Sequence, residues 1–206
     1  MIGLDPDMIF RIPALLITLT VHEYAHARMA VALGDPTPRV LGRLTLNPIA
    51  HLDPVGLIMM WLFKFGWAKP VPINPSYFKN YRQDTLIVSL AGPVSNMLLA
   101  LLTAFLIVIS AKMQLLSGGW LKVLSMTYTY NIILAIFNLV PIPPLDGSKV
   151  LASLLPVGQG RILEQMEQYG PFLLMGLVYI GVIGMITYPL ERGLSYVINV
   201  IVMTIL

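Results

Sequence analysis

A long apolar stretch near the N-terminus, Ile9 to Leu33, carries ionisable side chains in its second half. The stretch is long enough to cross a bilayer as a helix. His22, Glu23 and His26 lie within it, although an ionisable group at membrane depth costs several kcal/mol on most estimates. We therefore expect a metal ion, a partner or a water-filled cavity to compensate these three side chains.

Residues 22–26 read His-Glu-Tyr-Ala-His, which is an H-E-x-x-H pattern. On a helix, positions i and i+4 share one face, so both imidazoles can reach one zinc ion. Glu23 is then placed to take a proton from a water molecule. In a chain with only three histidines, a chance match has odds of roughly one in a thousand. The pattern predicts a zinc site inside this helix.

The composition is that of an integral membrane protein, with 57% apolar and 11% charged residues. An average soluble domain has about 25% charged residues. The net charge of +3 does not indicate nucleic-acid binding, because the basic residues are scattered along short loops where they set topology or meet anionic headgroups. Cysteine is absent, so zinc must be held by nitrogen and oxygen ligands. Because the first apolar segment carries the motif, we do not interpret it as a cleaved signal peptide.

The apolar segments predict an all-α polytopic membrane protein with about five to six transmembrane helices. Residues 1–206 are expected to form one membrane-embedded domain, with a catalytic core at about 8–155 and a C-terminal helical pair at about 169–206. The expected spans are about 8–33, 86–111, 120–140, and an antiparallel pair at about 171–188 and 190–206.

The connection between the first two spans has three features. Residues 39–44 alternate in polarity, which suits a short pair of strands. The apolar segment 55–65 is too short to span alone and predicts a half-helix or a re-entrant segment. Residues 66–75 hold three prolines and predict an extended segment.

Two histidines leave a catalytic zinc site one protein ligand short. Asp146 stands out because it follows three prolines in NLVPIPPLDG, where an irregular backbone can point a carboxylate inward. The alternative is that Asp146 is a helix N-cap. The full set of candidates far from the motif is His51, Asp53, Asp84, Asp146, Glu164, Glu167 and Glu191.

HEYAH within a membrane span, followed far downstream by N-x-x-P-x-P-x-x-D-G, resembles the site-2 protease family of intramembrane zinc metalloproteases. Segments 42–56, 66–75 and 91–96 resemble its compact bacterial branch, without a PDZ or CBS domain. The residues that fill the second pattern are Asn138, Pro141, Pro143, Asp146 and Gly147.

This resemblance implies that His22, His26 and Asp146 hold one Zn²⁺ ion and that Glu23 acts as general base. It also implies that Asn138 contacts the substrate or polarises its carbonyl. His51 and Asn96 are candidates to support the site, and the alternative for both is a structural role, such as an amide that bridges helices.

A transmembrane substrate hides its carbonyls in its own helix, so it must unwind before cleavage. The extended segment could then capture it by strand addition. The candidate substrate-binding residues are Trp67, Val71, Pro72, Ile73 and Asn74.

The implied activity is hydrolysis of peptide bonds within or near transmembrane segments, with transmembrane or signal-peptide-like proteins as substrates and no nucleic acid. The alternatives are a metal-ion binding or transport protein, a catalytically silent chaperone, and a hydrolase of lipids or other amides. The apolar spans and the bacterial resemblance imply a multi-pass protein of the cell (inner) membrane. The placement of Lys and Arg predicts that the N-terminus is outside and the histidines are nearer the cytoplasmic face. The sequence names neither the substrate nor the oligomeric state.

Overall fold

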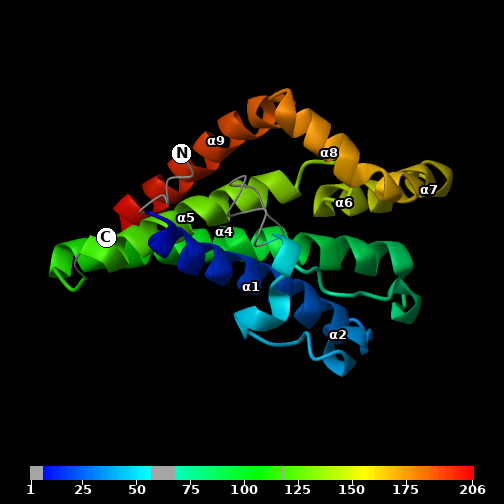
Figure 1. Ribbon diagram of the computed structural model, residues 1–206, viewed down its shortest axis with the longest axis horizontal. Coiled ribbons are helices and arrows are strands. Elements are labelled where there is room, and N and C mark those ends of the chain that lie inside the picture. Colours follow the sequence, from blue (N-terminus) through cyan, green and yellow to red (C-terminus); the bar gives the residue numbers. More distant parts are fainter. Residues whose placement is uncertain (1–6, 57–67, 117) are drawn as a thin grey trace.

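A computed structural model describes residues 7–56, 68–116 and 118–206 (Figure 1). Over these residues the chain is mainly helical, and the β-pairing found there is one isolated antiparallel bridge between Leu52 and Ala68. The prediction of an all-α protein is confirmed. The elements in chain order are α1 Met8–Ala32, α2 Thr37–Val40, η1 Pro48–His51, η2 Pro75–Tyr77, α4 Tyr81–Met113, α5 Gly118–Asn138, α6 Asp146–Leu154, α7 Val157–Gln165, η3 Met166–Gln168, α8 Gly170–Tyr179 and α9 Val182–Ile205.

Helices α1, α4 and α5 pack against one another, and α9 lies against α4 and α5 (Figure 1). Small side chains allow this close approach, since Ala100 and Ala104 of α4 join Ile132 of α5 and two α9 residues in one core cluster. The short helix α6 packs on α4. This packing brings Asp146, the first residue of α6, close to the α1–α4 pair.

The number of membrane spans is lower than predicted. Among the described residues, three helices are long and apolar enough to cross a bilayer, namely α1, α4 and α5. The two C-terminal stretches, which we predicted as separate spans, form one pair, α8 and α9, that raises the number to four at most. Helix α8, with 10 residues, is too short to cross by itself.

The expected antiparallel arrangement of the C-terminal pair is also wrong. The bend between α8 and α9 is 77°, which is far from a hairpin. The break lies at Gly181, which adopts a left-handed conformation with φ of 81° that glycine tolerates without steric cost. Pro189, where we expected the break, lies inside α9.

The connection between α1 and α4 agrees in part with the sequence analysis. Instead of strands, residues 37–40 form the short helix α2, because Pro38 in its first turn favours helical φ. The described part of the proline-rich segment, 68–74, is non-helical as expected. Most of the predicted half-helix at 55–65 lies outside the described residues, as does Trp67.

Candidate metal centre

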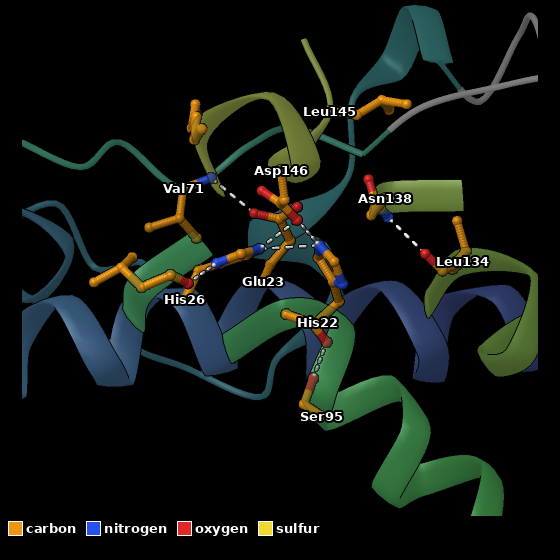
Figure 2. A network of polar contacts seen from close by, with 12 residues as sticks. His22, Glu23, His26, Val71, Ser95, Leu134, Asn138, Leu145 and Asp146 are labelled. Carbon is orange, nitrogen blue, oxygen red and sulfur yellow. Dashed lines mark hydrogen bonds and ion pairs between the residues drawn. The ribbon is translucent and has the colours of Figure 1, made fainter. Parts of the chain in front are cut away.

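His22, His26 and Asp146 meet in one buried cluster (Figure 2). His26 Nε2 lies 3.0 Å from His22 Nε2 and 3.1 Å from Asp146 Oδ2. His22 Nε2 lies 3.2 Å from the same carboxylate oxygen. Both imidazoles are buried in α1, and the Asp146 side chain is 15% exposed. Three candidate ligand atoms from two helices thus face a common point.

The proline-rich turn between α5 and α6 delivers Asp146 to this point. Leu145, and not Asp146, is the N-cap of α6, so the interpretation of Asp146 as a cap is wrong. Gly147 closes the turn against the end of α5. A Cβ added to Gly147 would lie 2.3 Å from the Leu139 carbonyl oxygen, so a larger residue would push Asp146 away from the histidines.

The donor set fits a zinc ion. Two imidazole nitrogens and one carboxylate oxygen are a common catalytic set, and tetrahedral ligands at about 2 Å from one ion stand about 3.3 Å apart. The separations of 3.0–3.2 Å match this. Burial disfavours ionised Asp146, but the imidazoles of His26 and His22 outweigh that effect and hold the pKa of Asp146 well below its ordinary value. A metal ion would bind the ionised carboxylate form of Asp146.

A backbone contact orients one of the two imidazoles. His26 Nδ1 lies 2.8 Å from the carbonyl oxygen of Val88 on α4. Since a carbonyl oxygen only accepts, His26 Nδ1 carries the proton and donates it. In the neutral ring, the lone pair of His26 Nε2 then faces His22 and Asp146, which is the usual arrangement of a metal-binding histidine.

Gly92 of α4 is a residue of the site for which the sequence analysis named no role. A Cβ added to Gly92 would lie 2.3 Å from His26 Nε2 and 2.5 Å from His22 Cε1. The absence of a side chain thus makes room for both imidazoles between α1 and α4. An isolated glycine in an apolar helix is the signal that could have indicated this close packing.

Glu23 reaches the same region from the face of α1 beside the histidines (Figure 2). Its side chain is buried, and its Oε2 atom accepts a hydrogen bond of 2.8 Å from the backbone N–H of Val71. The non-helical segment 68–74 therefore passes directly over the motif. The carboxylate lies next to the cluster, where a proton acceptor would be needed.

The other residues predicted for the site differ in burial and in their contacts. Asn138, half-buried at the end of α5, donates its amide to the Leu134 carbonyl oxygen at 3.0 Å and lies on the Asp146 side of the site (Figure 2). Val71 is buried, Ile73 is half-buried, and Pro72 and Asn74 are exposed.

His51 and Asn96 lie outside the set of three clustered candidate ligands. His51 is buried in η1 and contacts Thr45 and Arg43. Asn96 is fully buried on α4, one turn beyond Gly92.

Comparison with known proteins identifies the family. Residues 106–182, which include Asp146, match Peptidase family M50. The chain is 41% identical over 182 residues to a Bacillus subtilis protein named "Putative zinc metalloprotease YwhC", and the match covers 86% of this chain and 83% of that protein. The chain belongs to peptidase family M50.

Family M50 is the site-2 protease family, so the family that the paired motifs predicted is confirmed. It is also 32% identical over 175 residues to "Putative zinc metalloprotease Rip2" of Mycolicibacterium smegmatis, covering 79% of this chain and 64% of that protein. A third relative, "Putative zinc metalloprotease MJ0611" of Methanocaldococcus jannaschii, is 35% identical over 100 residues, covering 47% of this chain and 50% of the relative. No solved structure matches the chain.

Proposed function

We propose that this M50 protein is an intramembrane zinc metalloprotease that hydrolyses peptide bonds within or near transmembrane segments. The observation that carries the proposal is the meeting of Asp146 with the two imidazoles. Asp146 stands 120 positions beyond His26 in the chain, yet its carboxylate lies 3.1 Å from that ring. A buried donor set of this kind, with both imidazoles on a membrane-length helix, has little use except to hold a metal ion.

In this proposal His22, His26 and Asp146 hold one zinc ion, whose Lewis acidity makes water more acidic and polarises a carbonyl group. Glu23 accepts the proton of the water molecule whose oxygen attacks the peptide carbonyl carbon. Glu23 then returns that proton to the leaving nitrogen as the C–N bond breaks. The buried position of Glu23 beside the cluster supports this role.

Asn138 is proposed to contact the substrate near the scissile carbonyl. A single well-placed donor to a developing oxyanion is worth about 2.7–4 kcal/mol in other enzymes. Its amide now donates to Leu134 of its own helix, so it would have to exchange this bond for one to the substrate.

The segment 68–74 is proposed to bind the unwound substrate, through carbonyl oxygens more than through N–H groups. Lys69, Val71, Ile73 and Asn74 are the residues of 69–74 with a backbone N–H. Three of these four N–H groups already donate within the protein, to His51, Glu23 and Asp35. A substrate strand would therefore have to supply most of the donors itself.

The substrates are proposed to be transmembrane or signal-peptide-like proteins of the cell (inner) membrane. His22 and His26 lie in the second half of α1, and the distribution of basic residues favours the cytoplasmic side for that half. One multi-pass domain would then expose its active site to substrates that enter from the bilayer.

Zinc content and peptide hydrolysis of the purified protein in lipid vesicles test the proposal. Glu23→Gln is expected to keep one zinc ion and to lose turnover by about 10²–10⁴-fold, because it removes only the proton acceptor. The matched control is Glu191→Gln, at a half-buried glutamate of α9, which should cleave at the wild-type rate.

Cleavage by Glu23→Gln at the wild-type rate would refute the assignment of the base. Zinc movement across vesicles without peptide hydrolysis would indicate a carrier instead, and hydrolysis confined to a lipid panel would indicate a lipid hydrolase. Membrane proteomics that compares wild type with Glu23→Gln would then identify substrates as fragments that accumulate.

A further inference from the structure

The backbone around Val71 presents a single hydrogen-bond donor to Glu23. Val71 lies between Pro70 and Pro72, and proline has no backbone N–H. The Val71 N–H is therefore the only backbone donor of the tripeptide, and it donates to Glu23 Oε2 at 2.8 Å. Pro72 also restricts Val71 to an extended conformation, which limits how far this donor can turn away.

Two residues upstream, the backbone of Lys69 is held from both sides. Its N–H donates to the carbonyl oxygen of His51 at 2.9 Å. Its carbonyl oxygen accepts a hydrogen bond of 2.6 Å from Arg43 Nη2. The segment that carries Val71 is thus fastened at Lys69 to a separate loop, residues 43–51.

Arg43 and His51 form a connected pair within that loop. His51 Nε2 must donate to the Thr45 carbonyl oxygen, 2.8 Å away, because that oxygen only accepts. His51 Nδ1 is then the acceptor that faces Arg43 Nη2 at 3.5 Å. Arg43 is 6% exposed and His51 is 2% exposed. A guanidinium buried this deeply is costly unless it is hydrogen-bonded, and the Lys69 carbonyl oxygen is its shortest such contact.

We infer that Arg43 and His51 are positioning residues, which hold Lys69 so that the Val71 N–H orients the carboxylate of Glu23. The inference rests on the proposed role of Glu23 as general base. Both residues act through the segment 69–71, and the hydrogen bonds of their side chains go to each other, Lys69 and Thr45. A carboxylate misplaced by about 1 Å can cost about 100-fold in rate, so loss of this support lowers turnover while the metal stays bound.

The first test replaces Arg43. Arg43→Ala is expected to lower kcat by about 10- to 100-fold, with KM changing much less and zinc content unchanged. Arg43→Lys, which keeps a cationic donor for the Lys69 carbonyl oxygen, should recover most of kcat. The matched control is Arg39→Ala, since Arg39 is exposed in α2 of the same loop region. Wild-type kcat in Arg43→Ala would overturn the inference.

A double-mutant cycle separates positioning from general destabilisation. Val71→Pro deletes the donor itself and should lower kcat to a similar extent. If Arg43 acts through that donor, Arg43→Ala should cause little further loss in the Val71→Pro background. Losses that multiply fully would overturn the inference, because they would show that Arg43 acts by another route.

Hydrogen–deuterium exchange provides a readout that needs no catalytic activity. In residues 69–74, exchange should speed up in Arg43→Ala and stay at the wild-type rate in Arg39→Ala. Unchanged exchange in Arg43→Ala would overturn the inference even if activity fell. If the wild-type protein hydrolyses no peptide bond, the proposed function fails, whereas the exchange experiment still tests whether Arg43 holds this segment.

Discussion

The buried face of α1 and the C-terminal pair α8–α9 are built in opposite ways. On α1, polar side chains point inward: Thr18, His22, Glu23 and His26 are all at most 9% exposed. On α8 and α9, large apolar side chains point outward, as in Tyr179, which is 91% exposed, and Met185, which is 77% exposed. Lipid solvates such apolar surfaces, so the C-terminal pair needs few specific contacts. The buried polar face of α1 depends on partners from distant segments, so it should tolerate substitutions far less well.

The largest difference between the two regions is expected when a carboxylate is replaced. Asp146→Ala removes one of three clustered candidate ligands and should weaken zinc binding by more than the roughly 10–100-fold typical for loss of an outer partner of a ligand. Activity should be abolished with it. Glu191→Ala on α9 should leave zinc content, measured by metal analysis after dialysis, unchanged. An Asp146→Ala protein with full zinc content and activity would contradict the metal centre.

The next largest difference between the two regions is expected for glycine substitutions. Gly92→Ala places a methyl group within 2.3 Å of His26 Nε2, so both imidazoles must shift, and we expect at least about a 100-fold loss of activity with weaker zinc binding. Gly193→Ala, on α9, adds a Cβ that meets no atom within 4 Å. It should keep activity and stabilise the helix by up to about 1 kcal/mol. Normal activity and zinc titration of Gly92→Ala would show that α1 and α4 can separate at little cost.

The smallest difference between the two regions is expected when an asparagine is replaced. Asn131 of α5 is fully buried and donates to Thr18 Oγ1 on α1 at 2.9 Å. Asn131→Ala should lower the free energy of unfolding by about 0.6 kcal/mol, and by at most about 1.7, with zinc content unchanged. Exposed Asn199 of α9 should change stability by less than about 0.5 kcal/mol when replaced by Ala. Equal effects in a denaturant titration would remove this part of the contrast.

How far the sequence predicted the fold depended on whether the signal was local. The helical class and the cores of the first three spans followed from the lengths of the apolar runs, which lipid requires. The strand pair at 39–44 and the break at Pro189 were predicted wrongly. In the first case, a proline at the start of a turn outweighed alternating polarity. In the second, a proline was accommodated inside α9 while Gly181 made the bend.

The sequence alone determined that His22 and His26 share a face of one helix, because a spacing of four residues is a property of the helix itself. It also marked Asp146, through the prolines before it. Only the tertiary structure decided that Asp146 stands beside both imidazoles, that Gly92 makes room for them, and that the Val71 N–H reaches Glu23. These contacts join segments far apart in the chain. Their distances are set by how whole helices and loops pack, which no local pattern of residues encodes.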